Sequence, residues 1–88
     1  MQLPDRITTT WMKSLDDEQL IDAEFRLHTI FFQAEKAQKA IDGSRYDLMR
    51  APEALMAAWC RWSTVNGVTR ARGLHPRVKR RSGYLAGA

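Results

Sequence analysis

The chain has 88 residues, of which 44% are hydrophobic and 27% are charged. This length supports one small hydrophobic core, and this composition excludes the low hydrophobicity and high charge of a disordered chain. Its one cysteine, Cys60, excludes an internal disulfide and a site built from several thiolates, which favours a reducing, cytoplasmic setting. No stretch approaches the roughly 18 apolar residues of a membrane span, and residues 1–13 lack the pattern of a secretion signal. We therefore expect neither secretion nor insertion into a membrane.

The net charge of +4 is distributed unevenly along the chain. Residues 1–69 hold all ten acidic residues and eight basic ones, a net charge of −2. Residues 70–88 hold six basic residues and no acidic one, a net charge of +6. Such a block of positive charge favours a polyanionic partner, or a tail that its own repulsion keeps soluble.

The segment over residues 4–13 contains two large apolar side chains, Trp11 and Met12. A free tail would leave both side chains in water, where apolar surface is unfavourable. We therefore expect this segment to pack on the rest of the protein as an arm or a short helix.

The first long helix is predicted over residues 14–42. Ser14 is a suitable N-cap, and Asp16, Asp17 and Glu18 would place negative charge in the first turn, at the positive end of the helix dipole. Gly43 is suited to the left-handed conformation that often ends a helix.

Two apolar stripes run along this predicted helix. The main seam repeats at steps of three and four and consists of Leu20, Ala23, Leu27, Ile30, Ala34, Ala37 and Ile41. A second stripe consists of Ile21, Phe25, His28 and Phe32, with Phe31 beside the main seam. Together the stripes cover more of the circumference than one partner helix buries, so we expect this helix to contact two neighbours.

The second long helix is predicted over residues 52–72. Pro52 suits a first helical turn because its missing N–H would have no partner there. Gly73 and Pro76 form a stop signal, with Leu74 placed to pack back on the last turn. The apolar seam of this helix consists of Leu55, Ala58, Trp59, Trp62, Val65 and Thr69.

These elements predict an all-α fold, in which a long antiparallel helical hairpin carries the N-terminal arm or short helix. We assign residues 1–76 to a single helical domain and residues 77–88 to a basic flexible tail.

Few groups in the sequence are suited to catalysis. His28 and Cys60 could form an imidazole–thiolate pair across the hairpin, although both occupy positions typical of ordinary packing. Glu24 and His28, four residues apart, could begin a metal site, but two ligands do not complete one. We predict a non-enzymatic protein with no catalytic residues, metal, cofactor or small-molecule substrate.

The basic block is the most informative functional feature of the sequence. Cations in such a block can neutralise several phosphates and gain affinity from counterion release. The first two also suit the negative end of a helix, whereas those beyond Pro76 have no such structural role. We predict contact with a nucleic acid or a nucleoprotein through Arg70, Arg72, Arg77, Lys79, Arg80 and Arg81, with a solvated tail as the alternative.

Aromatic residues provide a second candidate surface. Trp59 and Trp62 flank Arg61, and aromatic residues with arginine are common anchors of protein interfaces, although the spacing also suits a hairpin core. A hairpin this small is not expected to cover all its aromatic rings by itself. We predict docking on a protein partner, or formation of a homo-oligomer, through Phe25, Phe32, Trp59, Arg61 and Trp62.

The leading functional hypothesis combines the two surfaces. The helical body would dock on a partner protein or on itself, while the basic segment contacts nucleic acid. The alternative is an accessory or inhibitor protein, of the kind carried by phages and mobile elements, that blocks a host protein through its helical surface.

Overall fold

The computed structural model describes residues 2–74, and these residues are mainly helical. The elements in chain order are α1 (Thr9–Lys13), α2 (Asp17–Asp42), the 3-10 helices η1 (Gly43–Arg45) and η2 (Leu48–Arg50), and α3 (Glu53–Ala71). No strand occurs within this part of the chain, so the all-α prediction is confirmed for it. Pro76 and the predicted tail, residues 77–88, lie outside the described residues.

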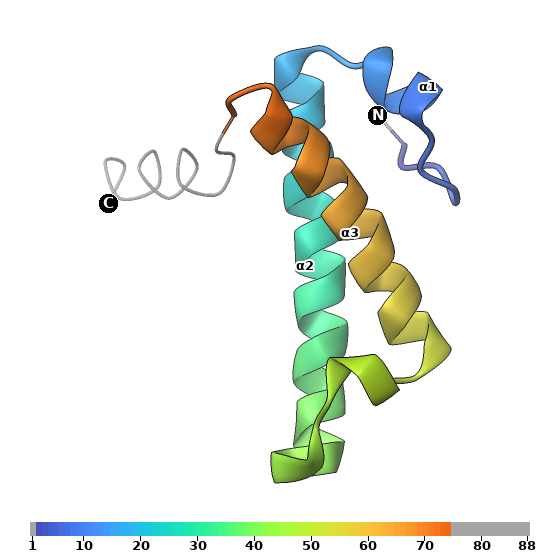
Figure 1. Ribbon diagram of the computed structural model, residues 1–88, viewed down its shortest axis with the longest axis vertical. Helices are drawn as coiled ribbons and strands as arrows, with labels where there is room; N and C mark the ends of the chain where they lie inside the picture. Colours follow the sequence, from blue (N-terminus) through green and yellow to red (C-terminus); the bar gives the residue numbers. More distant parts are fainter. Residues whose placement is uncertain (1, 75–88) are drawn as a thin grey trace.

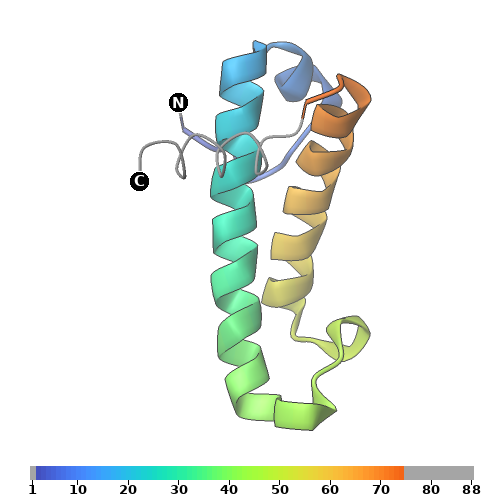
Figure 2. The same ribbon diagram turned by 90° about the vertical axis from the view of Figure 1, so that its left-hand side faces the viewer.

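The two long helices, α2 and α3, lie side by side and run in opposite directions (Figure 1; Figure 2). Figure 1 shows that the axis of α3 is inclined to that of α2, and both views show α2 extending beyond the start of α3 toward η1 and η2, which join the two helices. The N-terminal segment and α1 lie at the end of the pair that holds the start of α2 and the end of α3. The sequence left an arm and a short helix as alternatives for residues 4–13. The structure has both, since an extended N-terminal segment leads into the short helix α1.

The start of α2 differs from the prediction. Ser14 is the C-cap of α1, and its hydroxyl donates to the carbonyl oxygen of Trp11 at 2.6 Å. The N-cap of α2 is Asp16, whose carboxylate accepts from the backbone N–H of Gln19 at 2.8 Å. The Gln19 side chain accepts in return from the N–H of Asp16 at 3.0 Å. This reciprocal pair satisfies two backbone donors, so the helix begins three residues later than expected.

The predicted helix stops are confirmed at both glycines. Gly43 follows α2 with a φ of 59°, and Gly73 follows α3 with a φ of 78°. At the end of α3 the N–H of Leu74 donates to Thr69, and the N–H of Gly73 donates to Arg70, both at 2.9 Å. This hydrogen-bond pattern is a Schellman motif, which satisfies carbonyls that the helix leaves open.

The hydrophobic core lies where α1, the start of α2 and the second half of α3 meet. Its buried members are Met12, Leu15, Leu20, Ala23, Leu27 and Val65. Half-buried side chains from the N-terminal segment, α1, α3 and the residue after Gly73 pack against them, namely Leu3, Ile7, Trp11, Trp62, Val68 and Leu74. The predicted contact of the N-terminal segment with the helical pair is therefore present.

The second half of α2 does not follow the predicted seam. Ile30 is 44% exposed and Ile41 is 78% exposed, whereas Phe31 is buried. A straight α-helix rotates by roughly 20° per heptad relative to a repeat of 3.5 residues, so a buried stripe moves sideways along it. The end of α2 also extends beyond the start of α3, which leaves it with fewer neighbours (Figure 2). Within residues 2–74, no helix combines the length and apolar character needed to cross a bilayer.

Candidate binding surfaces

Arg72 fastens the end of α3 to the connection between α1 and α2. Its guanidinium donates to the carbonyl oxygens of Leu15 at 3.1 Å and Met12 at 3.3 Å, and it forms an ion pair with Asp17 at 3.3 Å. A planar guanidinium with several donors is suited to holding two carbonyls and a carboxylate at once. The sequence predicted Arg72 as a contact for nucleic acid, and the structure shows Nη1 and Nη2 of its guanidinium donating to partners within the protein.

Arg70 has a different environment from Arg72. It lies in the last turn of α3 and is exposed, so its charge is open to a partner. Of the six predicted nucleic-acid contacts, the other four, Arg77, Lys79, Arg80 and Arg81, lie outside the described residues.

Aromatic rings connect the two long helices along one side of their contact. Trp62 of α3 stacks on Phe31 with ring centroids 5.7 Å apart and an interplanar angle of 2°. His28 meets the same indole edge-on at 5.3 Å and stacks on Phe32 at 6.1 Å. The row therefore extends from the half-buried Trp62 to the exposed ring of Phe32. Aromatic pairs in such geometries contribute about 0.5–1.5 kcal/mol beyond the burial of their area.

Glu24 is the one fully buried acidic residue among those described, with no exposed surface. Its Oε1 accepts from the indole N–H of Trp62 at 2.7 Å and from the side-chain amide of Asn66 at 3.4 Å. Burying a carboxyl group is costly unless hydrogen bonds compensate, so these contacts stabilise the pairing of α2 with α3. The sequence showed Glu24 only as a possible metal ligand. The sequence signal that could have indicated its burial is its position in the stripe Leu20, Glu24, Leu27 and Phe31, at steps of four and three.

The five residues predicted to form a protein interface do not share one surface. Phe25 and Phe32 are exposed on α2, at 40% and 53% respectively. Trp59 and Trp62 are half-buried on α3. Arg61 points toward the N-terminal segment, where it donates to the carbonyl oxygen of Pro4 at 2.7 Å. Phe25 and Phe32 are thus the predicted pair that remains most open to a partner.

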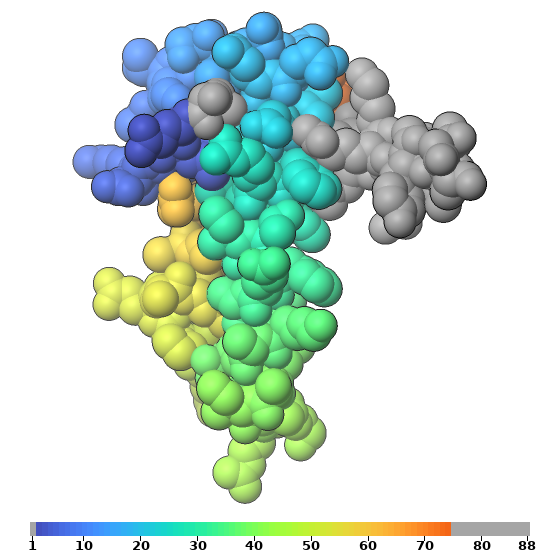
Figure 3. All heavy atoms as spheres, turned by 180° about the vertical axis from the view of Figure 1, so that it is seen from behind, coloured from blue at the N-terminus to red at the C-terminus, as the bar shows by residue number. Residues whose placement is uncertain are grey.

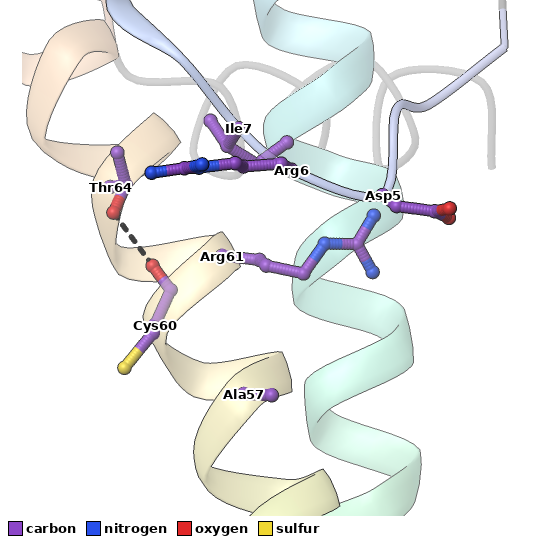
Figure 4. A pocket seen from close by; sticks show the side chains of 7 residues that line it. All are labelled: Asp5, Arg6, Ile7, Ala57, Cys60, Arg61 and Thr64. Atoms are coloured by element: carbon purple, nitrogen blue, oxygen red, sulfur yellow. Dashed lines mark hydrogen bonds between the residues drawn. The ribbon is translucent and has the colours of Figure 1, made fainter.

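A shallow hollow of about 310 Å³ lies between the N-terminal segment and α3 (Figure 4). Figure 4 shows Arg6 extending from the N-terminal segment toward α3, Arg61 extending from α3 toward that segment, and the Cys60 side chain pointing away from it. Its lining consists of Asp5, Arg6, Ile7, Ala57, Cys60, Arg61 and Thr64. Because Asp5 offsets one of the two arginines, the hollow has only a small excess of positive charge.

The structure does not bring Cys60 and His28 together. Cys60 lines the hollow beside the N-terminal segment, whereas His28 lies against Trp62. Cys60 and Trp62 are two positions apart in the sequence, which places their side chains about 160° apart around α3. Among residues 2–74 there is also no group of three or more histidine, cysteine, aspartate or glutamate side chains that could hold a metal ion.

Tyr46 anchors the turn between the long helices to α2. Its hydroxyl donates to the Glu35 carboxylate at 2.8 Å, and the Lys39 ammonium lies 5.2 Å from the centre of its ring. Partial burial, the hydrogen bond to Glu35 and the nearby carboxylates raise the pKa of Tyr46 to about 12. All three effects disfavour the phenolate.

Comparison of the chain with protein-family models, curated proteins and solved structures gave no match.

Proposed function

We propose that the chain is a small non-enzymatic binding protein. Its helical hairpin docks on a protein partner or on a second copy, and its basic segment, residues 70–81, contacts a nucleic acid or a nucleoprotein. The observation that carries this proposal is the separation of charge, because six basic residues and no acidic one follow Thr69. The exposed position of Arg70 in the last turn of α3 supports it.

The proposal assigns two roles within the basic segment. Arg72 holds the end of α3 in place through Met12, Leu15 and Asp17. The remaining residues supply the phosphate contacts, namely Arg70, Arg77, Lys79, Arg80 and Arg81. Phosphate contact of this kind gives affinity without base specificity.

The test is the salt dependence of binding to a nonspecific duplex and to a single strand. The logarithm of the affinity should fall linearly with the logarithm of the salt concentration, with a slope that shrinks by about 0.9 for each duplex phosphate contact removed. Replacing Arg77, Lys79, Arg80 and Arg81 with alanine should therefore remove most of the slope. An unchanged affinity and slope in this variant would overturn the proposal.

A matched control separates local contact from net charge. Arg6, Lys13, Arg45 and Arg50 are exposed and lie outside the basic segment, and their replacement with alanine removes the same number of charges. We expect this variant to keep most of the wild-type slope. An equal loss in both variants would show that affinity follows net charge, not residues 70–81.

The second candidate is an accessory or inhibitor protein that blocks a partner protein through its helical surface. The exposed rings of Phe25 and Phe32 favour it, because exposed aromatic rings are common anchors of interfaces. A complex with one defined protein that survives nuclease and high salt, and is lost when both rings are replaced with serine, would support this candidate. Recovery of nucleic acid alone would contradict it.

A further inference from the structure

A regular seam runs along the face of α2 that points away from the core. It contains seven residues at alternating steps of four and three, namely Glu18, Asp22, Phe25, Thr29, Phe32, Lys36 and Lys39. This spacing aligns side chains toward one neighbouring helix. Phe25 is two residues from the core residue Leu27, which places it about 160° away around the helix axis. Figure 3 views the molecule from behind, where α2, coloured cyan to green, lies in front of α3.

The middle of the seam is apolar and already arranged for contact. Phe25 is 40% exposed and Phe32 is 53% exposed. Thr29 lies between them, and its hydroxyl donates to the carbonyl oxygen of Phe25 at 3.0 Å. Covering Thr29 therefore leaves no hydroxyl unsatisfied. Stacking on His28, at 6.1 Å between ring centroids, supports Phe32 from one side.

The ends of the seam carry opposite charges. Glu18 and Asp22 lie toward the start of α2, and Lys36 and Lys39 lie toward its end. The order of charges is therefore reversed when the helix is turned end over end. An antiparallel second copy of α2 places Glu18 opposite Lys39, Asp22 opposite Lys36 and Phe25 opposite Phe32. A parallel copy would place like charges together, which is unfavourable.

Existing ion pairs on α2 do not prevent this arrangement. Asp22 lies 3.6 Å from Arg26, and Lys39 lies 3.6 Å from Glu35. These pairs are between neighbouring turns of the same helix, and the side chains of Asp22 and Lys39 are 45% and 55% exposed. Exposed pairs of this kind contribute about 0.3–0.5 kcal/mol, so they can be shared or replaced on contact.

We propose that the outer face of α2 is the interface of a homodimer, in which two copies pack antiparallel about a two-fold axis at Thr29. Such an interface is self-complementary, as two-fold symmetry requires. The seam spans about 30 Å of helix, and one helix against one helix covers less than the standard interface of about 800 Å² per partner. The dimer therefore has a modest affinity that depends on concentration. The seam ends at Lys39 and shares no residue with the basic segment, residues 70–81, so the dimer does not depend on nucleic-acid binding.

Light scattering after size exclusion, without nucleic acid, tests the dimer. Wild-type protein should shift from monomer to dimer between about 1 µM and about 1 mM, the range for an interface of this size. Phe25→Ser with Phe32→Ser should weaken the dimer at least about tenfold, because both rings lie at its centre. Ile41→Ser with Met49→Ser removes exposed apolar side chains outside the seam and should leave the dimer unchanged. A wild-type monomer throughout this range would overturn the proposal.

Charge reversal tests the orientation of the two helices. One variant carries Glu18→Lys and Asp22→Lys, and the other carries Lys36→Glu and Lys39→Glu. Each variant alone should dimerise at least about tenfold more weakly than wild type, because equal charges then meet at both ends. An equimolar mixture should dimerise again, since opposite charges meet at both ends of the mixed dimer. Wild-type dimerisation of either variant alone, or no recovery in the mixture, would contradict the antiparallel seam.

Disulfide trapping tests the position of the two-fold axis. In a Cys60→Ser background, Thr29→Cys should form a covalent dimer under mild oxidation, because residue 29 faces its own copy. Ala37→Cys lies elsewhere on α2 and should not. Equal cross-linking at the two positions would refute this register. The variant with alanine at Arg77, Lys79, Arg80 and Arg81 should still dimerise, so failure of nucleic-acid binding and failure of the dimer are separate outcomes.

Discussion

Glu24 shows how one polar residue can fix the pairing of two helices. It lies in the buried stripe of α2, where an apolar residue could pack against α3 in several rotations. Its Oε1 instead accepts from Trp62 and Asn66, which are four residues apart on one side of α3. Hydrogen bonds depend on direction, so this contact specifies the rotation and the register of the helices more tightly than apolar packing alone.

Replacement of Glu24 should distinguish its hydrogen bonds from its volume. Glu24→Gln retains a side-chain oxygen for the indole N–H of Trp62 and should cost little stability. Glu24→Ala removes this acceptor and leaves a cavity, so we expect a loss of about 2–4 kcal/mol. Urea unfolding followed by circular dichroism measures both values. Equal losses in the two variants would show that the acceptor oxygen contributes nothing.

Tyr46 provides a prediction for alkaline pH. Its pKa is raised to about 12, above the ordinary value of 10.0. The unfolded protein therefore loses this proton at a lower pH than the folded protein. The stability contributed by Tyr46 should be complete below about pH 10 and should be lost as the pH rises toward about 12.

Ultraviolet titration of the phenolate in a Tyr84→Phe background isolates the Tyr46 signal, because the chain has two tyrosines. Glu35→Gln should lower the pKa of Tyr46, since it removes a negative charge and a charge-assisted hydrogen bond. A pKa for Tyr46 that does not change in Glu35→Gln would contradict this account.

At the scale of elements, Arg72 joins the end of α3 to the connection between α1 and α2, which is distant in sequence. Arg72→Ala leaves the carbonyl oxygens of Met12 and Leu15 without this donor, so we expect a loss of about 1–3 kcal/mol in the free energy of unfolding. Arg70→Ala changes an exposed side chain two residues away and should remain within about 0.5 kcal/mol of wild type. Thermal or urea unfolding of the two variants provides the comparison. Similar values for both would show that the Arg72 contacts do not stabilise the fold.

The elements themselves were largely predictable from local sequence signals. The spacing of apolar residues predicted both long helices, and Gly43 and Gly73 predicted where they end. These signals act over a single helical turn, so they can be interpreted without knowledge of the fold. The predicted start of α2 was wrong because Ser14 and Asp16 both have side chains that can cap a helix. Which of the two becomes the N-cap of α2 depends on the Gln19 side chain and on the presence of α1. The buried state of Glu24 and the role of Arg72 were missed because their partners lie about 40 and 55 or more residues away along the chain.

The candidate surfaces were predictable only in part. The sequence identified Phe25 and Phe32 correctly as apolar positions outside the core seam. It grouped them with Arg61, which the structure places against Pro4. Residues that share one face of a helix can be predicted from the helical repeat. Residues that come from two helices and a terminal segment can be grouped only when the packing angle between these elements is known.

At the scale of the whole molecule, the two proposals are coupled. A dimer through α2 carries two basic segments, each beginning at the end of an α3 helix. When two linked sites bind one polyanion, the second contact forms at a high effective concentration. Dimerisation and nucleic-acid binding should therefore strengthen each other on a polyanion long enough to reach both segments, because linkage between two binding events is reciprocal.

A comparison of long and short duplexes tests this coupling. For a long duplex, Phe25→Ser with Phe32→Ser should lower the affinity by about tenfold or more, because the second basic segment is lost from the complex. For a duplex too short to reach both segments, the same variant should bind as wild type does, since residues 70–81 are unchanged. Fluorescence anisotropy at one fixed salt concentration, with protein above the dissociation constant of the dimer, measures both affinities. A loss on the short duplex equal to that on the long one would place the phenylalanines in the nucleic-acid contact itself, and no loss on either would mean that the two segments act independently.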